Sequence, residues 1–199
     1  MKRLGIDRFS EAESLFQLET TIKRCKRCPL GKTRTKFVFG VGNPDADIVF
    51  IGEAPGRDED LQGIPFVGRA GKLLDKMLAE IGLNRNDVYI ANILKCRPPE
   101  NRDPESEEVD ECLPYLIKQI KLIKPKVICS LGRVAAQRIL QTTMSLGAMR
   151  GRWFDYHGIK FMVTYHPAAI LRTNSYMAGA LQDLRRLAKT VNSMENGSK

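Results

Sequence analysis

The sequence lacks any long hydrophobic run: no stretch approaches the roughly 20 apolar residues that a membrane-spanning helix needs. Its first residues, Met-Lys-Arg-Leu-Gly-Ile-Asp, also lack the apolar core of a secretory signal peptide. Internal repeats and low-complexity segments are absent as well. These absences argue against a membrane protein and a repeat array, and we expect a cytoplasmic globular protein with no membrane partner.

Acidic residues are outnumbered by basic ones. The 199 residues include 32 Lys and Arg against 23 Asp and Glu, which gives a formal net charge of +9. A basic balance fits a polyanionic partner such as nucleic acid. Because the cations are spread along the whole chain and form no basic tail, folding has to assemble any binding face.

Short apolar runs rich in β-branched residues alternate with helical patterns along the chain, which is long enough for one sizeable core. Residues 47–52, 87–94 and 126–132 have the pattern of buried strands, and residues 153–164 have that of a hairpin. We predict an α/β fold, a three-layer α/β/α sandwich on a mostly parallel four-stranded sheet, in a single domain over 1–199.

Capping signals predict where two helices begin. Ser10 and Glu13 have the spacing of a capping box, which predicts a first helix from there to about Lys23. Asp103 precedes Pro104 and acidic residues follow, which is the pattern of a helix N-terminus. We therefore expect Asp103 to cap the helix that follows.

Glycine and proline mark the other boundaries. Gly-Val-Gly-Asn-Pro at 40–44 predicts a turn, and because this Gly-x-Gly precedes its strand, it does not fit the dinucleotide-binding fingerprint. An amphipathic helix after Arg69 is expected to end at Gly82. A last helix over about 175–191 is followed by a tail, about 193–199, that we expect to be frayed.

Four chemically informative side chains stand at or near the ends of the predicted strands. Glu53 follows the first strand, Asn92 lies in the second, His166 follows the last, and Phe66 lies on a glycine-rich loop. Parallel α/β sheets hold ligands at the carboxyl ends of their strands. Together an amide, an aromatic ring and a histidine predict a pocket for a flat ring such as an extruded nucleobase. Each residue alone also fits an ordinary role in a turn or in the core.

Five cysteines in a reducing compartment indicate a metal centre of four thiolates with one cysteine to spare. Cys25 and Cys28 form a Cys-x-x-Cys pair, and Cys96 and Cys112 lie far along the chain. Cys129, within a predicted strand, is expected to be a buried and inert thiol. The spacing leaves zinc and an iron–sulfur cluster both open, and a chance set of cysteines is the third alternative.

The chain resembles the family 4 uracil-DNA glycosylases in four sequence blocks, which occur in the order of the family's motifs. The blocks are Gly-Glu-Ala-Pro-Gly at 52–56, Gly-Ile-Pro-Phe-Val-Gly at 63–68, Asn-Ile-Leu-Lys-Cys-Arg-Pro-Pro at 92–99 and His-Pro-Ala-Ala-Ile-Leu-Arg at 166–172. The likeness covers about Cys25 to Arg186. It implies an α/β/α fold and hydrolysis of the N-glycosidic bond of deoxyuridine in single- or double-stranded DNA, which releases uracil and leaves an abasic site.

The resemblance also implies a [4Fe–4S] cluster and a role for each matching residue. Glu53 would orient or activate water, and His166 would stabilise the charge that develops on the leaving uracil. The implied cluster ligands are Cys25, Cys28, Cys96 and Cys112. The implied uracil-binding residues are Gly52, Ala54, Glu59, Phe66, Asn92 and Asn101, with Glu59 crowding the methyl group of thymine. The implied DNA contacts are Ile170 and Leu171, as a wedge in the base stack, and Arg172, on a phosphate.

The chain departs from the better-known glycosylase branch at Ala54, where that branch has its catalytic aspartate. Whether Glu53 abstracts a proton or only positions water therefore stays open. A non-catalytic iron–sulfur nucleic-acid-binding module is the alternative function, whereas a zinc-dependent deaminase is disfavoured because its His-x-Glu and Pro-Cys-x-x-Cys motifs are missing. We expect a monomer that associates with the nucleoid, and we find no convincing motif for binding a sliding clamp.

Overall fold

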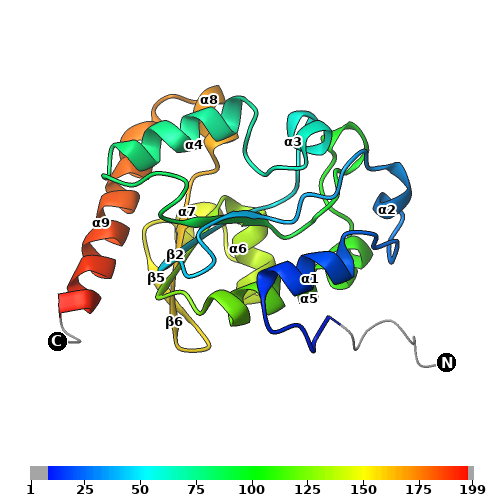
Figure 1. The fold of residues 1–199 in the computed structure, drawn as a ribbon. Helices are drawn as coiled ribbons and strands as arrows, with labels where there is room; N and C mark the ends of the chain where they lie inside the picture. The colour runs from blue at the N-terminus through cyan, green and yellow to red at the C-terminus, as the bar shows by residue number, and fades with distance from the viewer. Residues whose placement is uncertain (1–8, 197–199) are drawn as a thin grey trace.

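A sheet forms the centre of the molecule, with helices on either side (Figure 1). It has six strands in the order β1-β3-β2-β4-β6-β5. The computed structural model describes residues 9–196, with side chains as far as residue 194. The four inner strands are parallel, and the two edge strands run antiparallel to their neighbours. The strands are β1 (Val41–Gly42), β2 (Ile48–Gly52), β3 (Tyr89–Asn92), β4 (Val127–Leu131), β5 (Trp153–Tyr156) and β6 (Ile159–Thr164).

The sequence predicts four strands, and the sheet is mixed and has two more. Residues 40–44, predicted as a turn, contain β1, which pairs with β3 through Val41 and Ile90. A strand of two residues has no alternation for periodicity to detect. The hairpin is present as predicted, but both of its arms join the sheet, so β5 adds an antiparallel edge.

Helices cover both faces of the sheet. Helices α1, α5 and α6 contribute buried residues to one core, and α4, α8 and α9 contribute to the other. Every residue of β2, β3 and β4 is buried between these layers, which is why their sequences are apolar except for Asn92 and Ser130. The helices are α1 (Leu15–Ile22), α2 (Leu30–Thr33), α3 (Arg57–Gln62), α4 (Arg69–Ala79), α5 (Ser106–Ile123), α6 (Arg133–Leu140), α7 (Leu146–Met149), α8 (Pro167–Arg172) and α9 (Tyr176–Asn196), with a short 3₁₀ turn η1 (Pro99–Asn101).

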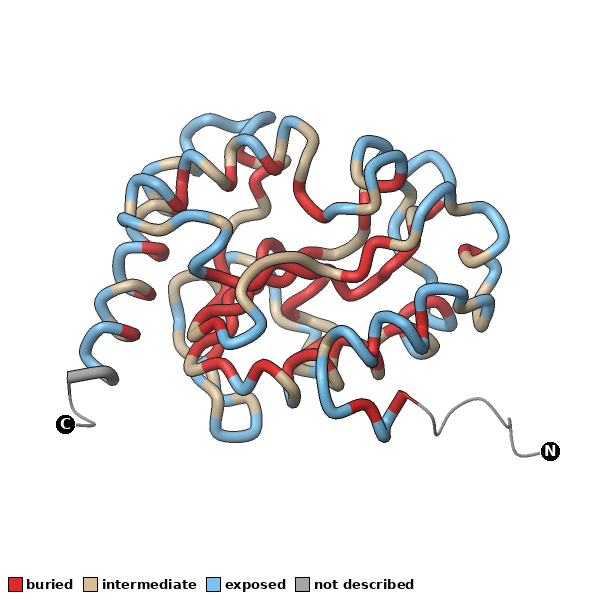
Figure 2. Tube along the Cα trace, in the orientation of Figure 1, coloured by how far each residue is buried: buried red, intermediate tan, exposed pale blue. Residues whose placement is uncertain are grey.

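Figure 2 shows buried positions concentrated in the sheet and on the inward sides of the helices. In α4, for example, Leu74, Met77 and Leu78 are buried at helical spacing. None of the described helices combines the length and the apolar character of a bilayer crossing.

The first helix begins later than its predicted cap. Helix α1 starts at Leu15, and the Ser14 hydroxyl accepts a hydrogen bond from the Gln17 amide at 3.2 Å. The prediction of Ser10 as the cap is wrong, because the serine four residues on stands directly before the residues that the core buries, Leu18 and Ile22.

Helix α5 also starts two residues beyond the predicted position. Its N-cap is Glu105, whose amide donates to the Glu108 carboxylate at 2.9 Å, so Asp103 and Pro104 lie outside the helix. Arg102 binds the same Glu108 carboxylate through two nitrogens, at 2.6 and 2.9 Å. These bonds hold Glu108 in place and so favour Glu105, rather than Asp103, as the N-cap.

The last helix is longer than predicted. Helix α9 continues through Asn196, so the first residues of the predicted frayed tail are helical, and residues 197–199 lie outside the described part of the chain.

The carboxyl ends of the parallel strands form one edge, which positions the functional groups. Gly52 at the end of β2 pairs with Asn92 at the end of β3, and Leu131 of β4 pairs with Thr164 of β6. After β2, β4 and β6 the chain enters the segments that carry Glu53, the start of α6 and the start of α8, respectively. Residues more than 100 positions apart therefore meet at this edge.

Candidate active site

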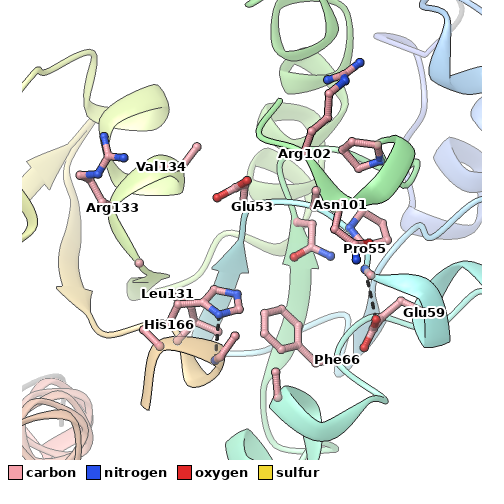
Figure 3. A pocket seen from close by; sticks show the side chains of 18 of the residues that line it. Glu53, Pro55, Glu59, Phe66, Asn101, Arg102, Leu131, Arg133, Val134 and His166 are labelled. Carbon is pink, nitrogen blue, oxygen red and sulfur yellow. Dashed lines mark hydrogen bonds between the residues drawn. The ribbon is translucent and has the colours of Figure 1, made fainter. Parts of the chain in front are cut away.

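A pocket of about 450 Å³ opens at the carboxyl edge of the sheet (Figure 3). We call it the edge pocket. The structure gathers most of the predicted site residues around it: Glu53, Ala54, Glu59, Phe66, Asn92, Asn101, His166 and Arg172. The volume lies within the range of small-molecule sites in proteins.

Asn92 provides a buried amide to this pocket. Its side chain is 2% exposed, and within the described residues its Oδ1 has no hydrogen-bond partner. Gly52 lies beside it: a Cβ atom at this position would overlap Asn92 Oδ1 and the Phe66 ring. A buried acceptor without a partner is unfavourable by roughly 1–3 kcal/mol. The amide is therefore prepared for a ligand that donates a hydrogen bond.

Phe66 is held in a left-handed backbone conformation, with φ at 53°. The Glu59 carboxylate stabilises this loop by accepting hydrogen bonds from the Val67 and Gly68 amides, both at 2.9 Å. Its other oxygen accepts from the Gly56 amide at 3.1 Å. Glu59 thus lines the pocket with a carboxylate that three backbone amides hold in place.

Arg85 fixes the other side of the same loop. Its guanidinium donates to the Pro65 carbonyl at 2.7 Å and to the Phe66 carbonyl at 2.9 Å. Gly71 of α4 permits the close approach, because a Cβ there would overlap the Phe66 carbonyl. The aromatic ring is therefore positioned by hydrogen bonds to the carbonyls and the amides around it.

His166 is the N-cap of α8 and faces Phe66, with 5.6 Å between the ring centroids. Its Nδ1 accepts a hydrogen bond from the Ala168 amide at 3.1 Å. Burial lowers the pKa of His166 to about 4, and the positive charge of Arg172 adds to this effect. The imidazole is therefore neutral near pH 7, and because Nδ1 is an acceptor, its proton is on Nε2.

Glu53 lies directly after β2, and its backbone carbonyl accepts from the Leu94 amide at 3.0 Å. Burial raises the pKa of Glu53, and the nearby charge of Asp103 raises it further, whereas Arg133 lowers it. In Figure 3 the carboxylate stands on the same side of the pocket as Arg133. The pocket thus combines a half-buried acid with a neutral imidazole donor.

Asn101 lies on the strained rim of the edge pocket. Its φ is 54°, and its Oδ1 accepts from the Arg97 side chain at 2.8 Å. A left-handed conformation is less unfavourable for asparagine than for most residues. The side chain therefore stabilises the rim loop from which it lines the pocket.

The two residues of the predicted wedge, Ile170 and Leu171, differ in their exposure to solvent. Ile170 is only 2% exposed and packs in the core with α4 and α9, so this structure does not present it at the surface. Leu171 is 43% exposed, and Arg172 is exposed and reaches the pocket. On a short helix against the sheet, adjacent residues face different ways, so only one of the pair can point outward.

Four cysteines meet at a second, smaller cavity, which we call the cysteine cage: Cys25, Cys28, Cys96 and Cys112. Nitrogen donors surround the sulfurs. Arg34 donates to Cys96 Sγ at 3.1 Å, and the Lys95 amide donates to Cys112 Sγ at 3.2 Å. Cys129 lies apart, fully buried in β4.

The donor set of the cage is four cysteine sulfurs, which suits zinc or an iron–sulfur cluster. Within the described residues no group of three or more His, Cys, Asp or Glu side chains has the arrangement that holds one metal ion. A [4Fe–4S] cluster binds each thiolate through a different iron atom, so its cysteines lie farther apart than those of a zinc site. Hydrogen bonds from nitrogen to the sulfurs are also common around such clusters.

The sequence matches a known family model over most of its length. The model describes the uracil DNA glycosylase superfamily, and it matches residues 39–185. The chain belongs to this superfamily.

Several curated relatives of this chain belong to one type within the superfamily. It is 53% identical over 169 residues to a type-4 uracil-DNA glycosylase of Archaeoglobus fulgidus, covering 80% of this chain and 84% of that protein. It is 42% identical over 190 residues to the type-4 enzyme of Saccharolobus solfataricus, covering 91% and 88%. It is also 42% identical over 181 residues to that of Thermotoga maritima, covering 90% and 91%. The family predicted from the four sequence blocks is confirmed.

Two arginines of this superfamily member were not predicted as site residues. Arg102 and Arg133 line the edge pocket together with the predicted groups. Arg133 follows Gly132 at the end of β4, so the rule that selected Glu53 after β2 also applies to it. Arg102 carries no comparable signal, since its position depends on the fold of the loop between Cys96 and Cys112.

Proposed function

We propose that this protein is a DNA-repair enzyme that extrudes uracil from DNA and hydrolyses its N-glycosidic bond, releasing uracil and leaving an abasic site. The observation that carries this function is the buried Asn92 amide with its unpaired Oδ1 beside the Phe66 ring. Type-4 uracil-DNA glycosylases that share 42–53% of its residues support the same reaction.

The amide of Asn92 explains the choice of base. Its Oδ1 can accept from N3–H of uracil, and its Nδ2 can donate to O4. Cytosine presents the reverse pattern, so two buried groups would lose their partners, at roughly 1–3 kcal/mol each. The Phe66 ring would stack on the base and stabilise it by about 1–3 kcal/mol.

Glu59 excludes thymine because it cannot move away. Three backbone amides hold its carboxylate at the wall of the pocket, so a 5-methyl group would have to displace a bonded group rather than a free side chain. The loss of those hydrogen bonds would be roughly 1 kcal/mol or more for each.

His166 and Glu53 divide the chemistry between them. As the bond from N1 to C1′ breaks, negative charge develops on uracil and positive charge on the sugar. The neutral His166 donates its Nε2 proton in a hydrogen bond to the uracil oxygen. The Glu53 carboxylate faces the sugar, where it stabilises the cationic carbon and orients the water that adds to C1′.

The cysteine cage holds a [4Fe–4S] cluster in this proposal. Cys25 and Cys28 precede α2, whereas Cys96 and Cys112 flank the loop that carries Asn101 and Arg102 to the pocket. A bound cluster would cross-link these segments, because its four cysteine ligands come from different parts of the chain. The cage residues therefore act on the reaction through the positions of the segments that they hold.

DNA would lie across the carboxyl edge. Leu171 fills the gap that the extruded base leaves, and Arg172, with Arg102 and Arg133, contacts phosphates around the pocket. All these groups come from one chain, so we propose that the enzyme acts as a monomer.

An oligonucleotide with a single uracil tests the function. Cluster-loaded protein should make the strand alkali-labile at that uracil, in single strands and opposite guanine. A Glu53→Gln variant should lose about 10²-fold or more in rate, whereas Glu11→Gln, an exposed acid far from the pocket, should not. Intact substrate with the wild-type protein, or DNA binding without cleavage, would indicate a non-catalytic binding module instead.

A further inference from the structure

Lys95 is a fully buried lysine that the proposed reaction does not use. Its side chain is 0% exposed, and its ammonium donates to the Asn92 carbonyl at 2.8 Å and to Gln119 Oε1 at 2.6 Å. Gln119 is held in turn by the Phe39 carbonyl at 3.0 Å and the Tyr89 hydroxyl at 3.1 Å. The lysine thus belongs to an ordered polar network inside the protein.

Both hydrogen-bond acceptors of this ammonium are neutral. A buried positive charge is unfavourable unless a negative charge compensates it. Within the described residues no carboxylate forms an ion pair with Lys95, so the hydrogen bonds to the Asn92 carbonyl and to Gln119 hold the ammonium in place.

The backbone of Lys95 reaches the same two places. Its amide donates to Cys112 Sγ at 3.2 Å, and its carbonyl accepts from the Val38 amide at 2.9 Å. One residue therefore contacts the cysteine cage through its amide and the last residue of β3 through its ammonium.

We propose that Lys95 is a positioning residue that couples the cysteine cage to the base-reading amide of Asn92. Its amide donates to a cage sulfur, and its ammonium holds the Asn92 carbonyl. The position of the Asn92 side chain at the pocket then depends on a residue whose backbone is bonded to the cage. This inference rests on the function proposed above.

A Lys95→Met variant of the cluster-loaded protein tests the coupling. Methionine fills similar space but removes the charge and both hydrogen bonds. The Kd for free uracil, measured by calorimetry, should rise roughly tenfold, because the Asn92 carbonyl loses its hydrogen bond to the ammonium.

Tyr89→Phe is the matched control. It removes a hydroxyl from the same buried network but touches neither the Asn92 carbonyl nor the cage, so the Kd for uracil should stay at the wild-type value. If Lys95→Met does not fold, the double variant Lys95→Met/Gln119→Leu removes both partners of the 2.6 Å hydrogen bond and relieves the unpaired acceptor.

Unchanged uracil affinity in a folded variant would overturn the positioning role. Equal changes in Tyr89→Phe would show only a general effect of the network. A wild-type protein that binds and excises no uracil would instead contradict the proposed function itself.

Discussion

Asn92 and His166 are polar side chains at the sheet edge, and their hydrogen bonds determine their chemistry. Asn92 keeps an unpaired acceptor, whereas the acceptor nitrogen of His166 is occupied by the Ala168 amide. The first residue is therefore prepared to read a donor on the base, and the second has only a donor left to offer.

Asn92→Asp should relax the choice between uracil and cytosine. A buried aspartate is protonated more readily, and its carboxyl group can bond to either base. We expect kcat/KM for uracil to fall about 10²-fold and the ratio of uracil to cytosine excision to fall with it. Asn192→Asp, exposed on α9, serves as the control. Unchanged selectivity would show that the amide does not read the base.

His166 should make folding stability depend on pH. Its folded pKa of about 4 lies below the ordinary 6.5, so the unfolded chain takes up a proton first as the pH falls. The contribution of His166 is complete above pH 6.5 and is lost between 6.5 and 4, by at most about 3 kcal/mol. Urea unfolding of wild type and His166→Gln at several pH values measures the difference.

The pH control uses the other histidine of the chain. His157→Asn, in the exposed hairpin turn with φ at 53°, should keep the acid sensitivity of the wild type. An identical pH profile for wild type and His166→Gln would contradict a neutral imidazole in the folded protein.

At the scale of elements, two loops and one short helix complete the pocket that the strands begin. The Phe66 loop is held by Glu59 and Arg85, and α8 presents His166 at its start and Leu171 near its end. These segments have few sequence constraints of their own, so their positions depend on bonds to distant residues.

Arg85→Met should weaken substrate binding by releasing the Phe66 loop. Two carbonyl hydrogen bonds disappear, and we expect kcat/KM for uracil-containing DNA to fall roughly tenfold, mainly through KM. Asp75→Asn is the matched control, since it removes only the ion pair of Arg85 with Asp75 at 2.8 Å. Such a partly exposed pair contributes about 0–1 kcal/mol. Equal losses in both variants would argue against a role of the loop bonds.

Leu171→Ala should impair excision from duplex DNA more than from single strands. A wedge stabilises the gap in a base stack, and a single strand has no paired stack to refill. We expect kcat/KM to fall about tenfold on the duplex. Ile170→Val, a core change, should lower stability by about 1 kcal/mol without distinguishing the two substrates. A similar loss on both substrates would contradict the wedge.

At the scale of the whole molecule, the fold brings part of the net positive charge of +9 to the edge pocket. Arg102, Arg133 and Arg172 come from three different segments and meet at the edge pocket. Lysines such as Lys121, near the end of α5 that leads into the amino end of β4, lie at the opposite edge of the sheet. Only the first group is placed to follow a DNA backbone past the pocket.

The salt dependence of DNA binding tests whether the arginines at the pocket contact phosphates while Lys121 does not. The slope of log K against log salt should be about −0.7 to −0.9 for each phosphate contact. Arg172→Gln should reduce the slope by one such contact, whereas Lys121→Gln should leave it unchanged. A flat profile for the wild-type protein would argue against a phosphate-binding face.

The inner strands, the hairpin and the residues around the pocket could be predicted because their signals are local. Burial on both faces makes β2, β3 and β4 mostly apolar, and each is followed by a break that places its last residues at the ligand edge. Helix starts were less accurate, because Ser10 and Ser14 offer similar caps and only packing of the helix selects one.

The sequence by itself determined the α/β class, the family and the set of chemical groups, because strand periodicity and motif order are written in consecutive residues. Only the tertiary structure decided that Ile170 is buried while Leu171 is exposed, that Glu59 is held by three amides, and that Lys95 lies between the cage and Asn92. These outcomes depend on contacts between residues far apart in the chain, and such contacts exist only after the sheet has brought its ends together.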